Sequence, residues 1–454
     1  MQRVMAQYVP REMAVLGLVE VALSFTLIYA MIQVSGAPAV VAGAAVAGSI
    51  GHGPGDSMAL AALVASSTGL IGLSIGLYQP DVCLNRRRLL STTCLAAVLA
   101  FAVLLAFSSV LGAQFSLANA LATGRVFAVW LLAIAIIRVM LGLDVVQNLL
   151  VRRLVLLGDR AHVAAYAGRL HSRRGRVFEP VTMDPRELSW QLLRRHRIWG
   201  VVLLPGAGAP IGDTLLDCKL RGVPIFSGTG FQEHYLGRID PDSLSVDDLL
   251  VADGFAGGRF GAALKRCCDI LIALVITLLT LPVMALAVVA IRLDSPGPII
   301  YRQQRVGQFG RIFTVFKFRS MRIDAEACGK PRWAQTGDPR VTRVGRFIRA
   351  SRIDELPQLA NVLRGEMSLV GPRPERPLFV EQLVQVIPFY RQRAYVKPGL
   401  TGWAQVNYPY GASVEDAHEK LAYDLYYVKH RSFWLDLVIL LRTVRVVLFR
   451  EGAR

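Results

Sequence analysis

Four long apolar stretches occupy the first third of the chain, at about Met13–Val34, Met58–Tyr78, Leu89–Gly112 and Val126–Val146. Each is close to the ~20 residues that an α-helix needs to cross the hydrocarbon core of a bilayer. The pattern therefore predicts a four-helix transmembrane region within residues 1–150.

Arg138 interrupts the fourth stretch, and a charge inside an apolar helix is costly in a membrane. One interpretation is that its long side chain reaches toward the inner headgroups. The other is that Arg138 is a functional charge inside the helical bundle.

Beyond residue 151, short apolar segments alternate with helical patterns. The predicted strands and helix are Leu154–Leu157, Ala161–Leu170, Val201–Leu204 and Pro224–Ser227. This alternation indicates a small parallel α/β domain over residues 151–242. Asp159 and Arg160 follow Gly158, so the Gly-x-Gly-x-x-Gly turn that lets a backbone approach a pyrophosphate is missing. We therefore expect a degenerate Rossmann-like, CoA-binding-like module with a structural or regulatory role.

Residues 243–263 are first acidic and then rich in glycine, which is typical of a linker. Another apolar run extends from Ile270 to Ile291, with Pro282 in its middle. Proline removes a helix hydrogen bond and bends the axis, and basic residues at both ends disfavour a simple crossing. A re-entrant helix at 268–292 fits both features, and a proline-kinked transmembrane helix is the alternative.

Composition and charge support a membrane protein. Of the 454 residues 53% are hydrophobic, the mean hydropathy is +0.43 and the formal net charge is +18. A basic excess suits nucleic acid, an anionic membrane surface or phosphorylated substrates, and the apolar content favours the last two. Six cysteines without a CxxC pair or a ligand-like spacing to histidine indicate reduced thiols, with no disulfide framework or zinc site.

Positive charge marks alternate loops of the apolar region. Arginines precede the first stretch, separate the second from the third and follow the fourth, whereas Ser35–Ser57 and Ala113–Thr123 contain no Lys or Arg. Because positively charged loops stay in the cytoplasm, we expect the chain to begin and to emerge on the cytoplasmic face.

The candidate chemistry lies between Tyr301 and Tyr410. Lys317 and Arg319 alternate with aromatic residues, so a strand would place both cations on one face, where they could grip phosphate oxygens. A solvated or lipid-facing basic strand is the alternative.

Asp354 and Glu355 precede an apolar helical pattern, where carboxylates can simply cap the helix. The functional interpretation is a nucleophilic aspartate beside a metal-binding carboxylate, with Mg²⁺ screening a diphosphate. Arg349 and Arg352 could then neutralise charge that develops on the phosphorus.

Two further segments carry candidate binding residues. Pro372 and Pro374 flank Arg373 and stiffen the turn, which suits bidentate phosphate recognition; a structural turn is the alternative. In the turn and predicted strand after Lys397, Trp403, Gln405 and Asn407 alternate to one side, which suits stacking and hydrogen bonding of a base. A packed core strand is equally consistent. The apolar segment Trp434–Phe449 predicts an amphipathic helix at the membrane interface or on the catalytic core.

These segments, in this order after a proline-containing apolar helix, resemble the bacterial sugar transferase family, the polyprenyl-phosphate hexose-1-phosphate transferases or monotopic phosphoglycosyl transferases. The resemblance covers residues 264–454 and rests on Lys-Phe-Arg-Ser-Met, Asp-Glu-Leu-Pro-Gln, Val-Gly-Pro-Arg-Pro and Pro-Gly-x-Thr-Gly-Trp-Ala-Gln. The upstream region resembles the large subclass, which starts exopolysaccharide or O-antigen repeat units. Asn407–Asp416 is similar to the branch associated with PEP-CTERM exopolysaccharide systems.

The resemblance implies a two-step phosphoglycosyl transferase reaction. Asp354 would attack the sugar-bearing phosphate of a UDP-sugar, release UMP and pass the phosphosugar to undecaprenyl phosphate, while Glu355, together with Asp354, binds Mg²⁺. The residues expected to bind substrate or phosphate are Lys317, Arg319, Arg349, Arg352, Arg373, Trp403 and Gln405. The family's re-entrant helix usually carries Ser-Pro at its break; here it is Leu281-Pro282, and Thr277 or Thr280 is expected to supply the missing hydroxyl.

The expected fold is an α-helical membrane bundle, a Rossmann-like α/β domain and a mixed α/β monotopic catalytic domain with a re-entrant helix. The expected location is the bacterial inner membrane, with the catalytic domain in the cytoplasm, where nucleotide-sugars are found. Expected partners are UDP-glucose or UDP-galactose, undecaprenyl phosphate and membrane lipid, but no nucleic acid; a homodimer and other polysaccharide-assembly proteins are further candidates. Two other functions compete: a single-displacement transferase in which Asp354 is a metal ligand or base, and a catalytically inactive scaffold.

Overall fold

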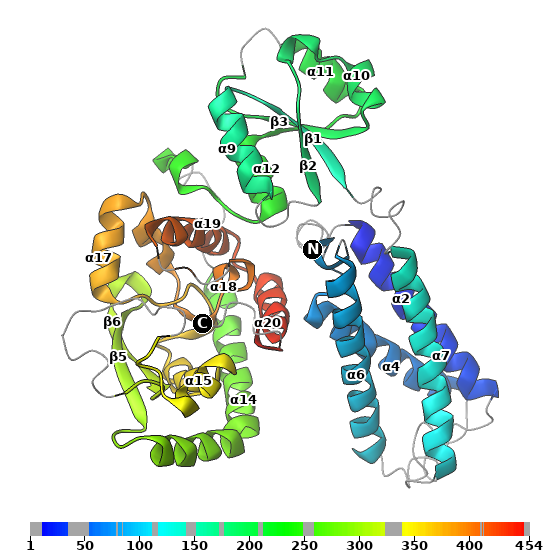
Figure 1. Ribbon diagram of the computed structural model, residues 1–454, viewed down its shortest axis with the longest axis vertical. Coiled ribbons are helices and arrows are strands. Elements are labelled where there is room, and N and C mark those ends of the chain that lie inside the picture. Colours follow the sequence, from blue (N-terminus) through cyan, green and yellow to red (C-terminus); the bar gives the residue numbers. More distant parts are fainter. Residues whose placement is uncertain are drawn as a thin grey trace. The chain divides into compact units, whose positions relative to one another are not determined.

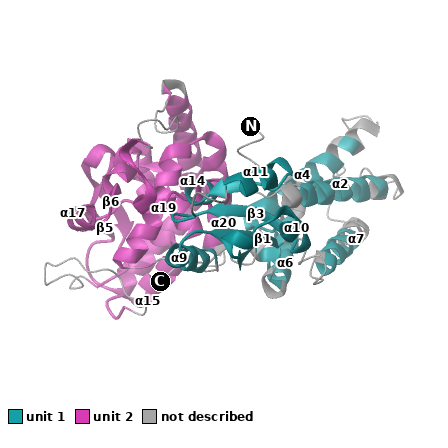
Figure 2. Ribbon diagram, turned by 90° about the horizontal axis from the view of Figure 1, so that it is seen from above, with its two compact units in different colours: residues 1–231 teal, residues 232–454 magenta. Residues whose placement is uncertain are grey.

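The computed structural model describes residues 11–34, 54–78, 80–83, 85–110, 117–141, 151–171, 177–207, 212–247, 258–322, 338–408, 411 and 413–448. The chain divides into two compact units, Met1–Phe231 and Gln232–Arg454 (Figure 2). The two loops without Lys or Arg, and the middle of the predicted linker, lie partly outside the described residues.

The first unit begins with four long helices that match the four apolar stretches. They are α2 (Arg11–Val34), α4 (Pro54–Ile75), α6 (Arg86–Val110) and α7 (Leu117–Leu141), with the short α5 (Pro80–Cys83) before α6. Contacts run from α2 to α4, to α6, to α7 and back to α2, so the helices close into a ring (Figure 1). Glycine on α4 permits this packing: a Cβ at Gly69 would lie 2.6 Å from the Val21 side chain.

Arg138 lies inside this ring of helices. Its side chain is 1% exposed and forms an ion pair with Glu20 of α2, with 2.6 Å between Nη2 and Oε2. The expectation that Arg138 extends to a headgroup region is therefore wrong, because a carboxylate on the neighbouring helix compensates its charge within the bundle.

The remainder of the first unit is a four-stranded parallel sheet in the order β2-β1-β3-β4. Its elements are β1 (Arg152–Leu157), α9 (Arg160–His171), β2 (Phe178–Thr182), η1 (Pro185–Glu187), α10 (Trp190–Arg195), β3 (Ile198–Leu203), α11 (Gly212–Leu220), β4 (Ile225–Ser227) and α12 (Gly228–Phe231). The three predicted strands are confirmed. The pattern does not indicate β2, because Glu179 and Pro180 interrupt its apolar residues; this strand lies at the edge, where proline is tolerated.

Gly158, at the end of β1, has a packing role. A Cβ there would lie 2.8 Å from Leu204 Cβ and 2.9 Å from the carbonyl oxygen of Pro205. The glycine therefore lets β1 and the segment after β3 approach each other.

The second unit contains the segment expected to be catalytic. Its elements are η3 (Gln232–Leu236), η4 (Pro241–Ser243), α14 (Arg259–Asp294), β5 (Ile300–Val306), η5 (Gln308–Gly310), β6 (Ile312–Phe318), α15 (Arg343–Ala350), η7 (Ile353–Gln358), α16 (Leu359–Arg364), β7 (Ser368–Val370), α17 (Pro377–Val386), η8 (Tyr390–Tyr395), β8 (Gly399–Thr401), α18 (Trp403–Asn407), α19 (Val414–His430) and α20 (Phe433–Leu448). β5 and β6 form an antiparallel hairpin, and β7 pairs with β8 in parallel.

Helix α14 is one continuous helix of 36 residues with Pro282 inside it. Figure 1 shows that it bends sharply, so that its two arms run in different directions. Among the described residues, Gly261–Asp294 is the one helix that is long and apolar enough by itself to cross a membrane. Pro282 cannot donate to the carbonyl of Leu278, but Thr277 and Thr280 do not take over that bond.

The two threonine hydroxyls bond elsewhere. Thr277 Oγ1 donates to the Ala273 carbonyl and Thr280 Oγ1 to the Ile276 carbonyl, both at 2.7 Å. The expectation that they satisfy the backbone group freed by the proline is wrong. Hydroxyl bonds of this kind, one turn back, bend helices and so add to the effect of the proline.

The second arm of α14 helps to build the core beneath the candidate site. Ala287 and Ile291 pack with Phe318 of β6 and Ile348 of α15. At the C-terminal end of α14, Asp294 Oδ2 accepts a 3.3 Å hydrogen bond from the Val344 N–H. The bent apolar helix is thus part of the framework that positions β6 and α15.

Candidate active site

Asp354 and Glu355 lie in the tight turn η7, between α15 and α16. The turn begins at Arg352, which has a left-handed backbone with φ of 59° and makes no side-chain capping bond. Both carboxylates are only 8% exposed. Because they lie within a short turn and not at the cap of an α-helix, the helix-capping interpretation of the pair is not the one that the geometry supports.

Glu355 is surrounded by cations. Its Oε1 is 2.6 Å from Arg373 Nη2 and 3.2 Å from Lys317 Nζ, and its Oε2 is 3.7 Å from Arg352 Nη1. Burial alone would raise the pKa of Glu355, but the three cations outweigh burial and hold that pKa well below its usual range. Glu355 is therefore a fixed negative charge that orients three basic side chains.

Asp354 has a different environment. No hydrogen bond to its side chain is found within the described part of the chain. Burial, and then the charge of Glu355, raise the pKa of Asp354 to about 6, against the opposing effect of Lys317, Arg349 and Arg352. At neutral pH the carboxylate is therefore ionised, near several cations and without a hydrogen bond that would reduce its nucleophilicity.

Two close contacts hold the helices on either side of the turn against β6 and the residues that follow it. Asn361 of α16 accepts from the Phe316 N–H at 3.2 Å and donates to the Thr314 carbonyl at 2.7 Å, so it pairs with the edge of β6. A Cβ at Gly345 would fall within 2.0 Å of the Ser320 carbonyl oxygen, so α15 can approach only with glycine there.

The backbone around Arg373 is braced by residues that the sequence motifs do not indicate. Arg393 Nη2 donates to the Arg373 carbonyl at 3.0 Å and lies 2.7 Å from Asp424 Oδ2, and Arg305 Nη1 donates to the Pro374 carbonyl at 2.9 Å. The sequence gives one signal for this network: Asp424 is an acid within the otherwise apolar and aromatic segment of α19. Arg305 and Arg393 carry no comparable signal among the many arginines.

Arg319 is not part of the site, although Lys317 is. Strand β6 ends at Phe318, so the alternation that would align the two cations does not extend to Arg319. Its guanidinium is buried and donates to the carbonyls of Ser295 at 2.6 Å and Pro296 at 2.9 Å. The expectation that Arg319 lines a phosphate site is wrong; it caps the C-terminal end of α14.

Trp403 and Gln405 lie in α18, which is a short helix and not the predicted strand. Trp403 is 1% exposed, stacks on Tyr426 and donates from Nε1 to the Gly237 carbonyl at 2.7 Å. Gln405 Nε2 donates to the Leu400 carbonyl at 3.1 Å. The geometry supports a packed core element, the alternative given above, because no face of the Trp403 ring is open to a base.

The donor chemistry of the Asp354–Glu355 pair fits Mg²⁺. This ion is bound through one or two carboxylates and completes its shell with water and substrate phosphates. Lys317 and Arg373 contact Glu355 Oε1 closely, whereas Glu355 Oε2 has the longer 3.7 Å contact with Arg352. The Asp354 carboxylate and Glu355 Oε2 would therefore hold the metal.

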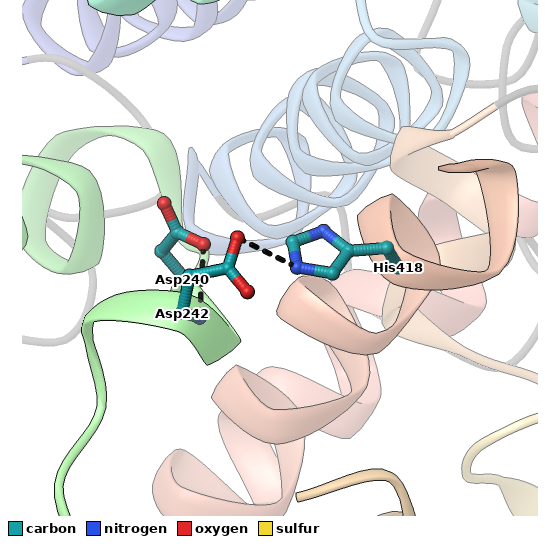
Figure 3. Close-up of side chains that lie close together, drawn as sticks. All are labelled: Asp240, Asp242 and His418. Atoms are coloured by element: carbon teal, nitrogen blue, oxygen red, sulfur yellow. Dashed lines mark hydrogen bonds and ion pairs between the residues drawn. The ribbon is translucent and has the colours of Figure 1, made fainter. Parts of the chain in front are cut away.

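A second carboxylate group lies elsewhere in this unit. Within the described residues, Asp240, Asp242 and His418 are the one set of three that bring potential metal ligands within 4.8 Å of one another (Figure 3). Their contacts have an ordinary explanation, because Asp240 caps η4 through the Asp242 N–H and Asp242 lies 3.1 Å from His418 Nε2. These contacts join the segment before α14 to α19.

Comparison with known proteins identifies a family match and several relatives of this chain. Residues 260–450 match the family described as Bacterial sugar transferase. The chain is 44% identical over 240 residues to a UDP-N-acetylgalactosamine-undecaprenyl-phosphate N-acetylgalactosaminephosphotransferase of Aeromonas hydrophila, covering 53% of this chain and 56% of that protein. It is 34% identical over 326 residues to an undecaprenyl-phosphate glucose phosphotransferase of Komagataeibacter xylinus, covering 67% and 60%.

A third relative is covered more fully. The chain is 46% identical over 191 residues to a UDP-glucose:undecaprenyl-phosphate glucose-1-phosphate transferase of Caulobacter vibrioides, covering 42% of this chain and 71% of that protein. The chain therefore belongs to the bacterial sugar transferase family. It spans less than two thirds of the length of the Aeromonas and Komagataeibacter relatives.

Proposed function

We propose that this protein transfers a sugar-1-phosphate from a UDP-sugar to undecaprenyl phosphate and releases UMP. The observation that carries the proposal is the contrast within η7: Glu355 is paired with three cations, whereas the neighbouring Asp354 carboxylate has a raised pKa and no side-chain hydrogen bond within the described residues. A free carboxylate among cations suits nucleophilic attack on a charged phosphate. The names of the three relatives support these substrates.

The proposed reaction has two displacements. An Asp354 carboxylate oxygen bonds to the sugar-bearing phosphorus, the bond from that phosphorus to the bridging oxygen breaks, and UMP leaves with that oxygen. A phosphate oxygen of undecaprenyl phosphate then bonds to the same phosphorus and frees Asp354. Arg373 and Lys317, already oriented by Glu355, stabilise the equatorial charge, and Arg349 and Arg352 add to the positive field around Asp354. Mg²⁺, when bound by Asp354 and Glu355, supplies further neutralisation of the diphosphate.

The setting of the reaction is also part of the proposal. Helix α14, with its sharp bend, enters and leaves the bilayer on the cytoplasmic side, where it holds the site close to the lipid substrate. Helices α2, α4, α6 and α7 span the inner membrane. The product would begin an exopolysaccharide repeat unit, in a PEP-CTERM system if the resemblance at Asn407–Asp416 holds. The sugar is a hexose; the names of the relatives divide between glucose and N-acetylgalactosamine.

Covalent trapping tests the mechanism. Purified protein is incubated with a UDP-sugar labelled in its sugar-bearing phosphate, without lipid substrate, and is then denatured. Label should remain on the wild-type protein and should be absent from Asp354→Asn. Arg322→Met, a change at an exposed arginine outside the site, is the matched control and should retain label. If UMP forms only when undecaprenyl phosphate is added and no protein is labelled, the single-displacement mechanism is correct instead.

A further inference from the structure

The four-helix ring of the first unit contains a buried polar seam. Glu20 of α2 and Arg138 of α7 meet where the last helix closes on the first, and their side chains are 4% and 1% exposed. An ion pair in an apolar helical bundle is expensive unless all of its polar atoms are satisfied. The hydrogen-bond partners of each polar atom of Glu20 and Arg138 therefore show which of these atoms lack a partner.

One oxygen of Glu20 has several partners. Oε2 accepts from Arg138 Nη2 at 2.6 Å and from the Tyr78 hydroxyl at 2.8 Å. Beside it, Trp130 Nε1 donates to Ser24 Oγ at 2.8 Å, and Ser24 Oγ donates to the Glu20 carbonyl at 2.7 Å. Helices α2 and α7 and the segment after α4 thus meet at the Glu20 carboxylate.

The other oxygen has none. Within the described residues, Glu20 Oε1 is buried and has no hydrogen-bond partner, as is also true of Arg138 Nε and Nη1. The Arg138 guanidinium lies 5.7 Å from the centre of the Tyr78 ring, which partly compensates its free N–H groups. An unpaired carboxylate oxygen has no such compensation, and a buried acceptor without a hydrogen bond destabilises the fold.

A small, partly open cavity is lined by Glu20. Its volume is about 20 Å³. The polar groups of its wall are contributed by Glu20, Ser24, Thr68, Tyr78, Thr93 and Trp130. A water molecule needs roughly 10–15 Å³ of such volume and two to four polar partners, and this cavity offers both.

The charge and size of the cavity exclude other occupants. A carboxylate in the wall repels anions, including lipid phosphate. A metal cation would compete with Arg138, which already neutralises Glu20, and would need several more oxygen ligands than one carboxylate and a few hydroxyls provide. Lipid tails gain nothing beside an unpaired carboxylate oxygen.

We propose that this cavity is a specific binding site for one ordered water molecule, which donates a hydrogen bond to Glu20 Oε1. The water completes the coordination of the Glu20–Arg138 pair and allows the first and last helices of the ring to be joined by charges in an apolar environment. The site is independent of the proposed transferase chemistry, because all of its residues belong to the first unit.

Radiolytic footprinting of the full-length protein in lipid nanodiscs tests the proposal. Ionising radiation converts bound water to hydroxyl radicals, which modify the side chains beside it. Tyr78 and Trp130 line the cavity and are buried, so their labelling reports water inside. Ala97→Val, which places two methyl groups at the cavity wall, should reduce labelling of both residues severalfold. Ala100→Val is the matched control, because Ala100 is equally buried in the same helix but does not line the cavity.

A density map of the unmodified protein provides a second measurement that does not depend on any variant. A peak within hydrogen-bond distance of Glu20 Oε1 supports the proposal. An empty cavity, a lipid tail in the cavity, or Glu20 bound to Arg138 through both oxygens overturns it. Wild-type protein whose Tyr78 and Trp130 remain unlabelled, while exposed aromatic residues react, also overturns it.

Discussion

Two adjacent carboxylates, Asp354 and Glu355, have opposite electrostatic states. Burial acts on both, but only Glu355 forms short contacts with cations, so its pKa is lowered while the pKa of Asp354 is raised. Adjacent titratable groups whose environments push their pKa values apart are typical of sites that divide chemical roles. Here Glu355 is the negative charge that orients the basic side chains, and Asp354 is the carboxylate that remains available for nucleophilic attack.

This contrast predicts opposite effects on stability. Asp354→Asn should leave stability unchanged or increase the free energy of unfolding by about 1–2 kcal/mol at pH 7.5, because a raised carboxylate pKa opposes folding once the pH exceeds it. Glu355→Gln should decrease it by about 2–4 kcal/mol, because Lys317, Arg352 and Arg373 lose their compensating charge. Thermal melting in detergent without divalent ions measures both, and UMP release should be lost in each variant. Equal destabilisation by the two changes would contradict the assignment.

The contact of Arg373 with Glu355 leads to a prediction about the planar geometry of its guanidinium group. Arg373→Lys keeps the charge but loses the planar fork that can bind Glu355 and a phosphate together, so kcat/KM for UMP release should fall about 10- to 100-fold. Arg376→Lys, three residues further on and outside the contacts of Glu355, is the matched control and should stay near the wild-type rate. A variant with lysine at 373 that works as well as the control would remove Arg373 from phosphate binding.

The sequence predicts the types of residue at the site better than it predicts which of them meet. Lys317 and Arg319 look equivalent in the pattern, yet the strand ends between them, and strand ends depend on the tertiary packing of Phe318. The contribution of Arg393 was not predictable, because it acts through the backbone of Arg373 from a segment 20 residues away.

Replacement of Arg319 is therefore expected to affect the stability of the fold and not the binding of substrate. Arg319→Met should decrease the free energy of unfolding by about 2 kcal/mol or more, because several carbonyls at the end of α14 lose a charged donor. The KM for the UDP-sugar should stay near the wild-type value in the folded fraction. The exposed Arg322→Met is the control for charge loss in the same segment. A large rise in KM without a change in melting temperature would restore Arg319 to the site.

At the scale of elements, apolar runs located the long N-terminal helices and three strands of the parallel sheet, but the pattern at α18 predicted the wrong type of element. The four N-terminal helices and three strands of the parallel sheet follow directly from apolar runs. Helix α18 does not, because five residues cannot display a helical period, and Pro-Gly followed by alternating polar residues indicates a strand equally well. The structure distinguishes the two, because the Val406 N–H donates to the Gly402 carbonyl and the Tyr408 N–H to the Ala404 carbonyl, as in a helix.

Trp403→Phe separates the two interpretations of this element. Phenylalanine keeps an aromatic ring but cannot donate to the Gly237 carbonyl, so the free energy of unfolding should fall by about 1–2 kcal/mol. The KM for the UDP-sugar should be unchanged if the ring is a core residue. Titration of UMP release against UDP-sugar, together with a melting curve, measures both. A rise in KM at unchanged stability would favour stacking on the base.

At the scale of the whole molecule, the boundary between the compact units does not coincide with the family match. The second unit begins at Gln232, whereas the match begins at residue 260. The intervening residues make specific contacts with the second unit: Arg238 pairs with Glu419 at 2.7 Å, and Glu233 pairs with Lys429 at 2.6 Å. Composition identifies residues 243–263 as a linker but gives no sign that the segment before it packs on α19.

This arrangement predicts how the chain can be shortened. A fragment of residues 232–454 should fold and release UMP at a rate comparable to the full chain, because its core and its candidate site are complete. A fragment of residues 260–454 lacks the Gly237 carbonyl that accepts from Trp403 and leaves Glu419 without Arg238. Its free energy of unfolding should therefore be lower by about 2–4 kcal/mol. The fragment of residues 232–454 that carries Arg238→Ala and Trp403→Phe should show most of that loss. Equal melting temperatures for the unsubstituted fragments 232–454 and 260–454 would mean that the segment before α14 contributes nothing to the stability of the second unit.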